Sequence, residues 1–249
     1  MLRNKTVIIT GSNRGIGLAT VEVFAKMGAE IWACSRTKSS EFEDTIGKLA
    51  AENQVPIHPV YFDVNDDPTV KRTIKEIGKI SGKIDVLVNN AGISVEKLFS
   101  MTSMETMRKT METNFLSQVQ ISQLVSRYMM KQKSGSIVNV GSVAGMRREQ
   151  GGLAYGSSKA AVIFYTRTMA LELGQYGIRV NSVSPGFIAT DMWAKRKDDI
   201  FEAIVRETPL GRQGDPREVA NTILFLASDL SSYMTGQNLV VDGGRFGGG

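Results

Sequence analysis

The sequence predicts an α/β fold built around an open, largely parallel sheet. Apolar, β-branched runs alternate with helical patterns along the chain, and the first run, 5–10, leads into a glycine-rich turn and a helix. The run 84–88 is apolar almost throughout, as in parallel strands that are covered on both faces. The chain has 249 residues, of which 42% are hydrophobic, so we expect one domain, 1–249, with a sizeable core.

Composition excludes several classes of protein. No apolar stretch reaches the roughly 18 residues that a membrane span needs, and we expect a soluble, cytoplasmic protein with no membrane partner. Cys34 and His58 are the only residues of their kinds, which excludes an internal disulfide, a thiol metal cluster and any Ser-His-Asp triad not built on His58. The net charge of +5 favours an anionic ligand or acidic partner, but no zinc spacing or RNA-binding motif points to nucleic acid.

The first strand, turn and helix form a candidate pyrophosphate site. Gly11 permits a tight turn, Gly15 lets backbone amides approach phosphate oxygens, and Gly17 lets the helix 18–27 pack close to the strand. The helix N-terminus adds partial positive charge. We therefore expect the cofactor to contact Gly11, Ser12, Asn13, Arg14, Gly15, Ile16 and Gly17.

The second strand, 30–35, ends where a dinucleotide fold would place an acid against the ribose 2′-hydroxyl. This chain has Ser35 and Arg36 there, and Arg14 in the glycine turn adds a second cation. Two guanidinium groups without an opposing carboxylate favour a 2′-phosphate, and so NADP(H) over NAD(H). The alternative is that Arg36 is an ordinary surface residue.

The next elements line the same side of the sheet. Ser40 and Glu43 suggest a capped helix to about residue 53, a third strand covers 57–63, and Asp67 with Pro68 begins another helix. The strand 84–88 ends in Asn89 and Asn90, whose side chains can bond neighbouring backbone, and in Ala91 and Gly92, which leave room for a cofactor. Candidate contacts are Asp63, Val64, Asn90, Ala91 and Gly92.

A hydroxyl, a phenol and an ammonium follow the fifth strand, 136–141. Ser142 lies at its C-terminal end, where ligands bind in parallel sheets. Tyr155 and Lys159 are four residues apart, and so share one face of the following helix. This trio can polarise a carbonyl and protonate it. Alone, the Tyr-x-x-x-Lys spacing is weak evidence, because it also occurs in ordinary amphipathic helices.

The long helical segment before it, 103–131, contains Asn114. A stripe of methionines at helical spacing is more typical of core or subunit contact than of a cofactor site.

The last third of the chain completes the sheet edge. A strand at 178–183 leads to Pro185, Gly186, Ile188 and Thr190, where a nicotinamide would lie. Residues 187–213, with Trp193 and the basic run 195–197, are expected to form a substrate lid. A helix begins at Asp215-Pro216, with Glu218 at the third helical position to complete a capping box. A final strand covers 238–242, and the glycine-rich tail is expected to be flexible.

Taken together, these motifs resemble the short-chain dehydrogenase/reductase family, and within it the NADPH-dependent reductases of 3-oxoacyl groups on acyl carrier protein. The resemblance runs from about residue 5 to 244. It implies a Rossmann-like three-layer αβα sandwich, a seven-stranded mostly parallel sheet and a homotetramer. The residues that carry it are Thr10, Gly11, Gly15, Ile16, Gly17, Asn89, Asn90, Ala91, Gly92, Asn114, Ser142, Tyr155, Lys159, Pro185, Gly186, 226–229 and 241–244.

The resemblance also implies roles for a catalytic tetrad. Tyr155 would be the general acid, with its pKa lowered toward working pH by Lys159 and the oxidised nicotinamide. Ser142 would bind the carbonyl oxygen, and Lys159 would reach the nicotinamide ribose. Asn114 would hold, through its helix, a water that relays protons to Lys159.

Two departures bear on the substrate. The segment Arg147-Arg148-Glu149 stands where the family has small and polar residues, which favours an anionic substrate. A carrier protein needs a basic surface near the site, for which Lys131 and Lys133 are candidates; the alternative is that both are ordinary solvated surface residues. Two alternatives stay open: the same chemistry on a sugar, polyol or hydroxy acid, and a non-catalytic NADP-binding regulator.

Overall fold

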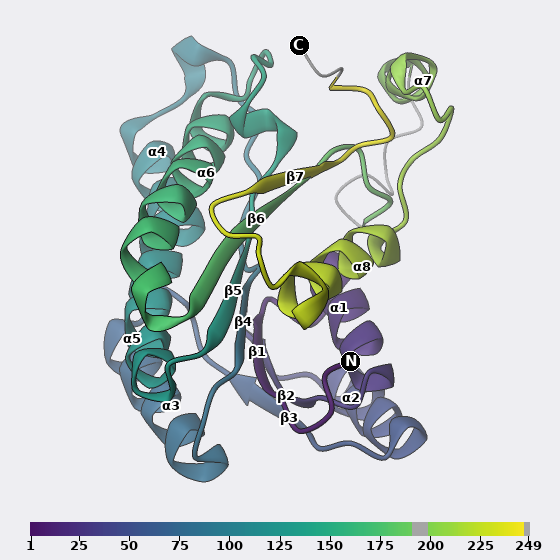
Figure 1. The fold of residues 1–249 in the computed structure, drawn as a ribbon. Coiled ribbons are helices and arrows are strands. Elements are labelled where there is room, and N and C mark those ends of the chain that lie inside the picture. The colour runs from purple at the N-terminus through teal and green to yellow at the C-terminus, as the bar shows by residue number, and fades with distance from the viewer. Residues whose placement is uncertain (191–198, 247–249) are drawn as a thin grey trace.

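The structure is a computed structural model that describes residues 1–190 and 199–246. Its centre is one seven-stranded sheet in the order β3-β2-β1-β4-β5-β6-β7 (Figure 1). All its strand pairs are parallel, where the sequence predicted mostly parallel pairs. The strands are β1 (Thr6–Thr10), β2 (Glu30–Ser35), β3 (Ile57–Tyr61), β4 (Val86–Asn89), β5 (Gly135–Val140), β6 (Ile178–Pro185) and β7 (Asn238–Val241).

Helices cover both faces of the sheet, which confirms the three-layer sandwich (Figure 1). One face packs against α1 (Gly15–Lys26), α2 (Ser40–Asn53) and α8 (Pro216–Ala227). The other packs against α3 (Asp67–Ser81), α5 (Ser117–Gln132) and α6 (Leu153–Leu173), with α4 (Met104–Met111) against α6. A further helix, α7 (Asp199–Glu207), lies apart from these layers.

A hydrophobic core lies on each face of the sheet, and alternate residues of each strand pack into one core or the other. In β1, Val7 and Ile9 face the core under α1 and α8, while Ile8 faces the core under α3 and α5. Phe24 of α1 is fully buried, and burial of such a side chain contributes about 1.5–3 kcal/mol. Because both faces are covered, each central strand is apolar on both sides, as the sequence predicted for β4.

Helix caps agree with the sequence to within one residue. At α8, Asp215 and Glu218 form the predicted capping box. For α2 the cap is Ser39, whose hydroxyl accepts the amide of Phe42, and not the predicted Ser40. The cap must have extended backbone, and Ser39 has it, with φ −145° and ψ 144°.

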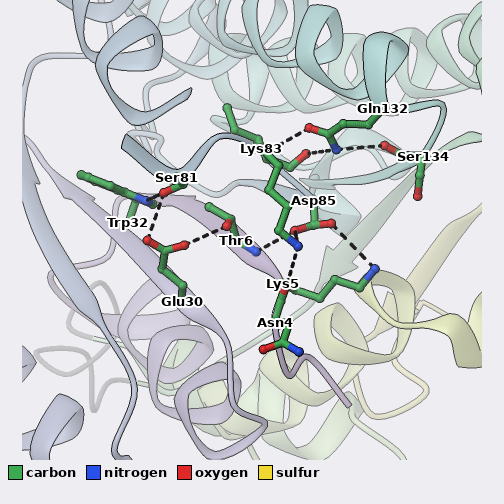
Figure 2. Close-up of polar contacts among 11 residues, drawn as sticks. Asn4, Lys5, Thr6, Glu30, Trp32, Ser81, Lys83, Asp85, Gln132 and Ser134 are labelled. Atoms are coloured by element: carbon green, nitrogen blue, oxygen red, sulfur yellow. Dashed lines mark hydrogen bonds and ion pairs between the residues drawn. The ribbon is translucent and has the colours of Figure 1, made fainter. Parts of the chain in front are cut away.

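A polar network closes the N-terminal edge of the sheet, opposite the predicted site (Figure 2). The carboxylate of Asp85 accepts the backbone amide of Thr6 at 2.8 Å and forms ion pairs with Lys5 and Lys83 at 3.8 and 3.0 Å. Glu30 accepts hydroxyl groups of Thr6 and Ser81 at 2.8 and 3.0 Å. These contacts tie β1, β2, α3 and the start of β4 together.

Two sequence candidates belong to this far edge. His58 stacks on Trp32, with ring centroids 4.3 Å apart, and its Nε2 lies 3.3 Å from Glu30. Lys131 and Lys133 precede β5, whereas Ser142 follows it, so they lie at the opposite end of that strand. The expectation that these lysines flank the site within one chain is therefore wrong: strand direction separates them.

The C-terminal segment 243–246 makes contacts that its composition did not predict. Arg245 contacts Glu207 at 2.9 Å, and the amides of Gly244 and Phe246 donate to the carboxylate of Asp242. These contacts join 243–246 to the end of α7. Residues 247–249 and residues 191–198 of the expected lid, including Trp193 and 195–197, lie outside the described residues. In the described chain no helix is long and apolar enough to cross a membrane, and no group of acidic, histidine and cysteine residues could hold a metal.

Candidate active site

The glycine turn after β1 has the geometry that a phosphate cradle needs. Gly11 and Gly15 have φ of +68° and +55°, a region that L side chains rarely adopt. A Cβ atom on Gly17 would lie 2.0 Å from the backbone oxygen of Gly11, so only glycine lets α1 pass this close to the turn. Gly11 and Gly17 therefore have the backbone geometry that the sequence predicted for a tight turn and a closely packed helix.

The N-terminus of α1 is open to an anion. Side-chain oxygens cap α2, α3, α4 and α8, but Arg14 at the start of α1 makes no side-chain cap. The first turn of α1 also contains no acid. The amide groups of this first turn and the positive end of the helix dipole therefore suit a pyrophosphate, which is the group that a dinucleotide cofactor would place here.

Asn90 fastens the end of β4 to this turn. Its Nδ2 donates to the backbone oxygens of Thr10 and Gly11, both at 3.0 Å, as the sequence predicted for an asparagine at this strand end. The amides of Asn90 and Ala91 donate in turn to the hydroxyl of Thr10, also at 3.0 Å. The floor of the candidate cofactor groove is therefore held by side chains as well as by the sheet.

The ends of β1 and β2 bring the two predicted arginines to one edge. Thr10 pairs with Cys34 in register, so Arg14 and Arg36 follow neighbouring strand ends, and both are exposed. Ser35 is buried, and its hydroxyl donates to the oxygen of Thr37 at 3.1 Å. Its side chain therefore shapes the turn before Arg36.

Other predicted cofactor residues are placed as follows. Ser12 is buried and donates to the oxygen of Ile9 at 2.7 Å, while Asn13 is exposed and Ile16 half-buried. Asp63 at the end of β3 accepts the amide of Asn65 at 2.9 Å, and Val64 follows it half-buried.

The segment after β6 also approaches the glycine turn. Ile188 is buried, and the methyl of Thr190 would lie 3.3 Å from a Cβ atom on Gly15. Gly186, after Pro185, has a packing role, because a Cβ atom there would lie 2.4 Å from Cβ of Asp242.

Ser142 and the Tyr–Lys pair meet because two glycines let their elements touch. Ser142 caps the short turn 143–145, where its hydroxyl accepts the amide of Ala144 at 3.2 Å. A Cβ atom on Gly145 would lie 2.7 Å from the amide of Ala160, and one on Gly156 would lie 2.8 Å from the oxygen of Ala144. The sequence analysis missed both glycines, although Gly156 lies inside the Tyr-x-x-x-Lys motif.

Lys159 is buried beneath Tyr155. Its Nζ donates to the backbone oxygen of Val140 at 2.8 Å and lies 5.7 Å from the centre of the Tyr155 ring. Burial lowers the pKa of Lys159 to about 8, because the charged form loses its hydration. The ammonium is therefore charged near neutral pH but titrates just above it.

The pKa of Tyr155 is raised in the chain alone, whereas the expected lowering depends on an oxidised nicotinamide as well as on Lys159. Burial raises the pKa, a hydrogen bond with Ser142 opposes the rise, and the carboxylate of Glu149 adds to it. In the chain alone, desolvation outweighs that hydrogen bond, so the phenol stays protonated and can act as a proton donor.

Asn114 lies in a π-helical turn, Glu112–Leu116, between α4 and α5, where a single long helix was predicted. Its Oδ1 accepts the amide of Ile93 at 2.8 Å, and its Nδ2 donates to the oxygen of Ile93 and the hydroxyl of Ser158 at 2.9 and 3.0 Å. A Cβ atom on Gly92 would lie 3.1 Å from Asn114 Oδ1 and 3.7 Å from Lys159 Nζ. Asn114 therefore lies close to Lys159, as the tetrad requires. The sequence analysis did not predict the contacts of Asn114 with Ile93 and Ser158, although Ser158 lies inside the Tyr-x-x-x-Lys motif.

The comparisons with known proteins decide the family. The family model described as enoyl-(acyl carrier protein) reductase matches residues 11–245. The chain belongs to the short-chain dehydrogenase/reductase family. This family assignment, with the relatives described next, makes the chain an oxidoreductase that acts on CH–OH donors and uses a nicotinamide cofactor.

Full-length relatives and solved structures agree with this family. The chain is 42% identical over 243 residues to a 3-oxoacyl-[acyl-carrier-protein] reductase of Thermotoga maritima, covering 98% of both chains. It is 36% identical to the Escherichia coli protein of that name, covering 97% of both. A putative gluconate dehydrogenase from Agrobacterium tumefaciens superposes with a TM-score of 0.95 at 30% identity, over 99% of this chain and 98% of that one. A Mycobacterium ulcerans short-chain dehydrogenase/reductase gives a TM-score of 0.93 at 28% identity, over 98% and 90%.

Proposed function

We propose that the protein reduces a ketone to a secondary alcohol with NADPH, and that its substrate is a 3-oxoacyl thioester on acyl carrier protein. The observation that carries the proposal is the convergence of Ser142, Tyr155 and Lys159 at the carboxyl end of β5. Relatives that cover nearly the whole chain are named as reductases of this substrate, which supports the choice.

The chain's own residues supply the proton chemistry. When bound, the nicotinamide supplies a hydride to the carbonyl carbon. Tyr155, protonated because burial raises its pKa, donates its phenolic proton to the carbonyl oxygen, which Ser142 holds by a hydrogen bond. Lys159 stabilises the phenolate that remains, and the oxygen of Val140 keeps its ammonium in place. Asn114 and its turn position the water that returns a proton toward Lys159.

Cofactor choice rests on the strand ends of β1 and β2. Arg36 is exposed and forms no ion pair with the residues that the structure describes, and Arg14 emerges from the neighbouring strand end. A 2′-phosphate would gain charge-assisted hydrogen bonds from both guanidinium groups. We assign NADP(H) on this ground.

The same site also suits a second class of substrate. The Agrobacterium structure is titled a putative gluconate dehydrogenase, and its similarity favours a sugar, polyol or hydroxy acid as the alternative. A non-catalytic NADP-binding regulator is disfavoured, because binding alone does not require a buried lysine under a tyrosine beside Ser142.

Association into a homotetramer is part of the proposal. Two large apolar side chains of α6, Phe164 and Leu171, are 70% and 83% exposed in the single chain. Met104 of α4, the helix that packs against α6, is also exposed. Exposed apolar area of this kind favours subunit contact over a cofactor site. A cytoplasmic location stays a prediction.

Steady-state reduction assays test the function. With NADPH, the wild-type protein should reduce acetoacetyl thioesters faster than keto sugars or keto acids. With the same thioesters, it should oxidise NADPH faster than NADH. Tyr155→Phe should keep NADPH affinity within about twofold and lose at least about a hundredfold in kcat, because the proton donor is gone. Activity confined to a sugar would favour the alternative, and full turnover by Tyr155→Phe would refute the acid assignment.

A further inference from the structure

Two ion pairs take no part in the chemistry above: Arg147 with Glu149, and Arg245 with Glu207. Arg147 and Glu149 come from the segment between Ser142 and Tyr155, Glu207 ends α7, and Arg245 belongs to the C-terminal segment. Of these four residues, Glu149 acts on the Tyr155 phenol through its charge.

Arg245 is already fully engaged. Its Nε and Nη2 lie 3.3 and 2.9 Å from one oxygen of Glu207, and its side chain is only 16% exposed. Hydrogen bonds from Arg245 are the main cause of the lowered pKa of Glu207. This pair joins α7 to the tail and leaves no unpaired charge.

Arg147 is engaged much less. Its only ion pair with the described residues is from Nε to Glu149 at 3.6 Å, which is long for a charge-assisted hydrogen bond. Its backbone is held, because its amide donates to the oxygen of Val143 at 3.0 Å. A guanidinium has five N–H donors, so the terminal nitrogens of Arg147 stay open to a planar oxyanion.

Arg147 lies near the C-terminal end of β5, because its backbone amide donates to the oxygen of Val143, the residue after Ser142. Glu149 lies just before α6, where its backbone oxygen accepts the amide of Gly152 at 3.1 Å, and its charge helps to raise the pKa of Tyr155. Arg147 also contributes, after Arg245, to the lowered pKa of Glu207. Arg147 and Glu149 therefore belong to the segment that joins Ser142 to Tyr155, at the end of the sheet where the candidate site forms.

We propose that Arg147 binds a carboxylate of the substrate, so that this chain reduces oxo acids as well as neutral ketones. The inference rests on the proposed ketone reduction and names a substrate class for the same site. Glu149 holds the guanidinium while the site is empty, and the carboxylate of an oxo acid replaces it in a bidentate contact.

The test compares acids with their own methyl esters. We would measure kcat/KM with NADPH for 3-oxobutanoate, 4-oxopentanoate and 5-oxohexanoate and for the three esters, which vary the distance between ketone and carboxylate. Arg147→Met should lower the acid-to-ester ratio of the preferred pair at least about tenfold, since one charge-assisted contact is lost. Arg147→Lys should lower the acid-to-ester ratio less, because lysine keeps the positive charge but lacks the paired, planar N–H donors of a guanidinium.

Two further variants sharpen the result. Glu149→Gln removes the competing carboxylate and should raise the acid-to-ester ratio. Arg148→Met removes the adjacent exposed arginine and should change the ratio less than about twofold. The ester rates show in every variant that the fold and the tetrad are intact.

The outcomes separate the two proposals. Reduction of esters without reduction of any acid, or an equal effect of Arg147→Met and Arg148→Met on the ratio, would overturn the role of Arg147. If neither acids, esters nor acetoacetyl thioesters were reduced, ketone reduction itself would be refuted, and the role of Arg147 with it.

Discussion

Lys159 Nζ donates a hydrogen bond of 2.8 Å to the backbone oxygen of Val140. This bond crosses from α6 to the last residue of β5, two residues before Ser142. It fixes the ammonium at the strand end, although burial disfavours its charge. The position of the Lys159 ammonium is therefore set by the sheet.

The pH dependence of reduction should follow this lysine. Because burial lowers the pKa of Lys159 to about 8, the ammonium is charged below that pH and loses its proton above it. The phenol of Tyr155, with its raised pKa, stays protonated over this range. We expect kcat/KM for reduction to be flat from about pH 6 to 7.5 and to fall up to about tenfold per unit above 8. A Lys159→Arg variant, which stays charged, should lack the decline; a flat wild-type profile to about pH 9.5 would contradict the assignment.

Cofactor preference should change at one arginine. Arg36→Ala should raise the KM for NADPH about tenfold or more and leave the KM for NADH nearly unchanged, since only NADPH carries the 2′-phosphate. Lys48→Ala, at an exposed position of α2, is the control and should alter neither value. Initial rates with both cofactors decide the matter, and equal effects of Arg36→Ala on the two would argue against the phosphate contact.

Two helical glycines should respond in opposite ways to alanine. At Gly17 a Cβ atom would lie 2.0 Å from the oxygen of Gly11, and the displacement should cost about 1–3 kcal/mol and weaken NADPH binding. At Gly47 in α2 a Cβ atom would meet nothing within 4 Å, so alanine should stabilise the helix by about 0.5–1 kcal/mol. Urea unfolding measures both; a neutral Gly17→Ala would show that the turn can relax.

The far edge of the sheet should affect stability but not turnover. Asp85→Ala leaves the buried amide of Thr6 without its acceptor and should lower the free energy of unfolding by about 1–3 kcal/mol. Asp44→Ala, exposed on α2, should change it by less than about 0.5 kcal/mol. Both variants should keep the wild-type kcat, and a large loss of kcat in Asp85→Ala would mean that the two edges are coupled.

The sequence predicted the elements that depend on local pattern. The strand-turn-helix around Gly11 and the capping box at Asp215 follow from neighbouring residues, and both were found. The contacts of Asn114 with Ile93 and Ser158 join residues 21 and 44 positions apart, which no local pattern records.

Long-range packing also explains features that composition and local pattern could not predict. The pKa of Tyr155 depends on burial, which only the assembled fold reveals. The glycine-rich tail was expected to be flexible because its partners, Glu207 and Asp242, could not be inferred from composition. Similarly, Lys131 and Lys133 precede the strand that leads to Ser142, but strand direction places them at its other end.

The π-turn at Glu112–Leu116 fixes the length of the chain between its two flanking helices. A π-turn holds about one residue more than an α-turn, so it takes up an extra residue without changing which way the following helix faces. Ile121, Val125 and Met129 therefore stay buried against the sheet, while Asn114, inside the turn, reaches Ile93 and Ser158. Deleting one residue there would close the turn into continuous α-helix and displace Asn114, yet leave that buried face against the sheet.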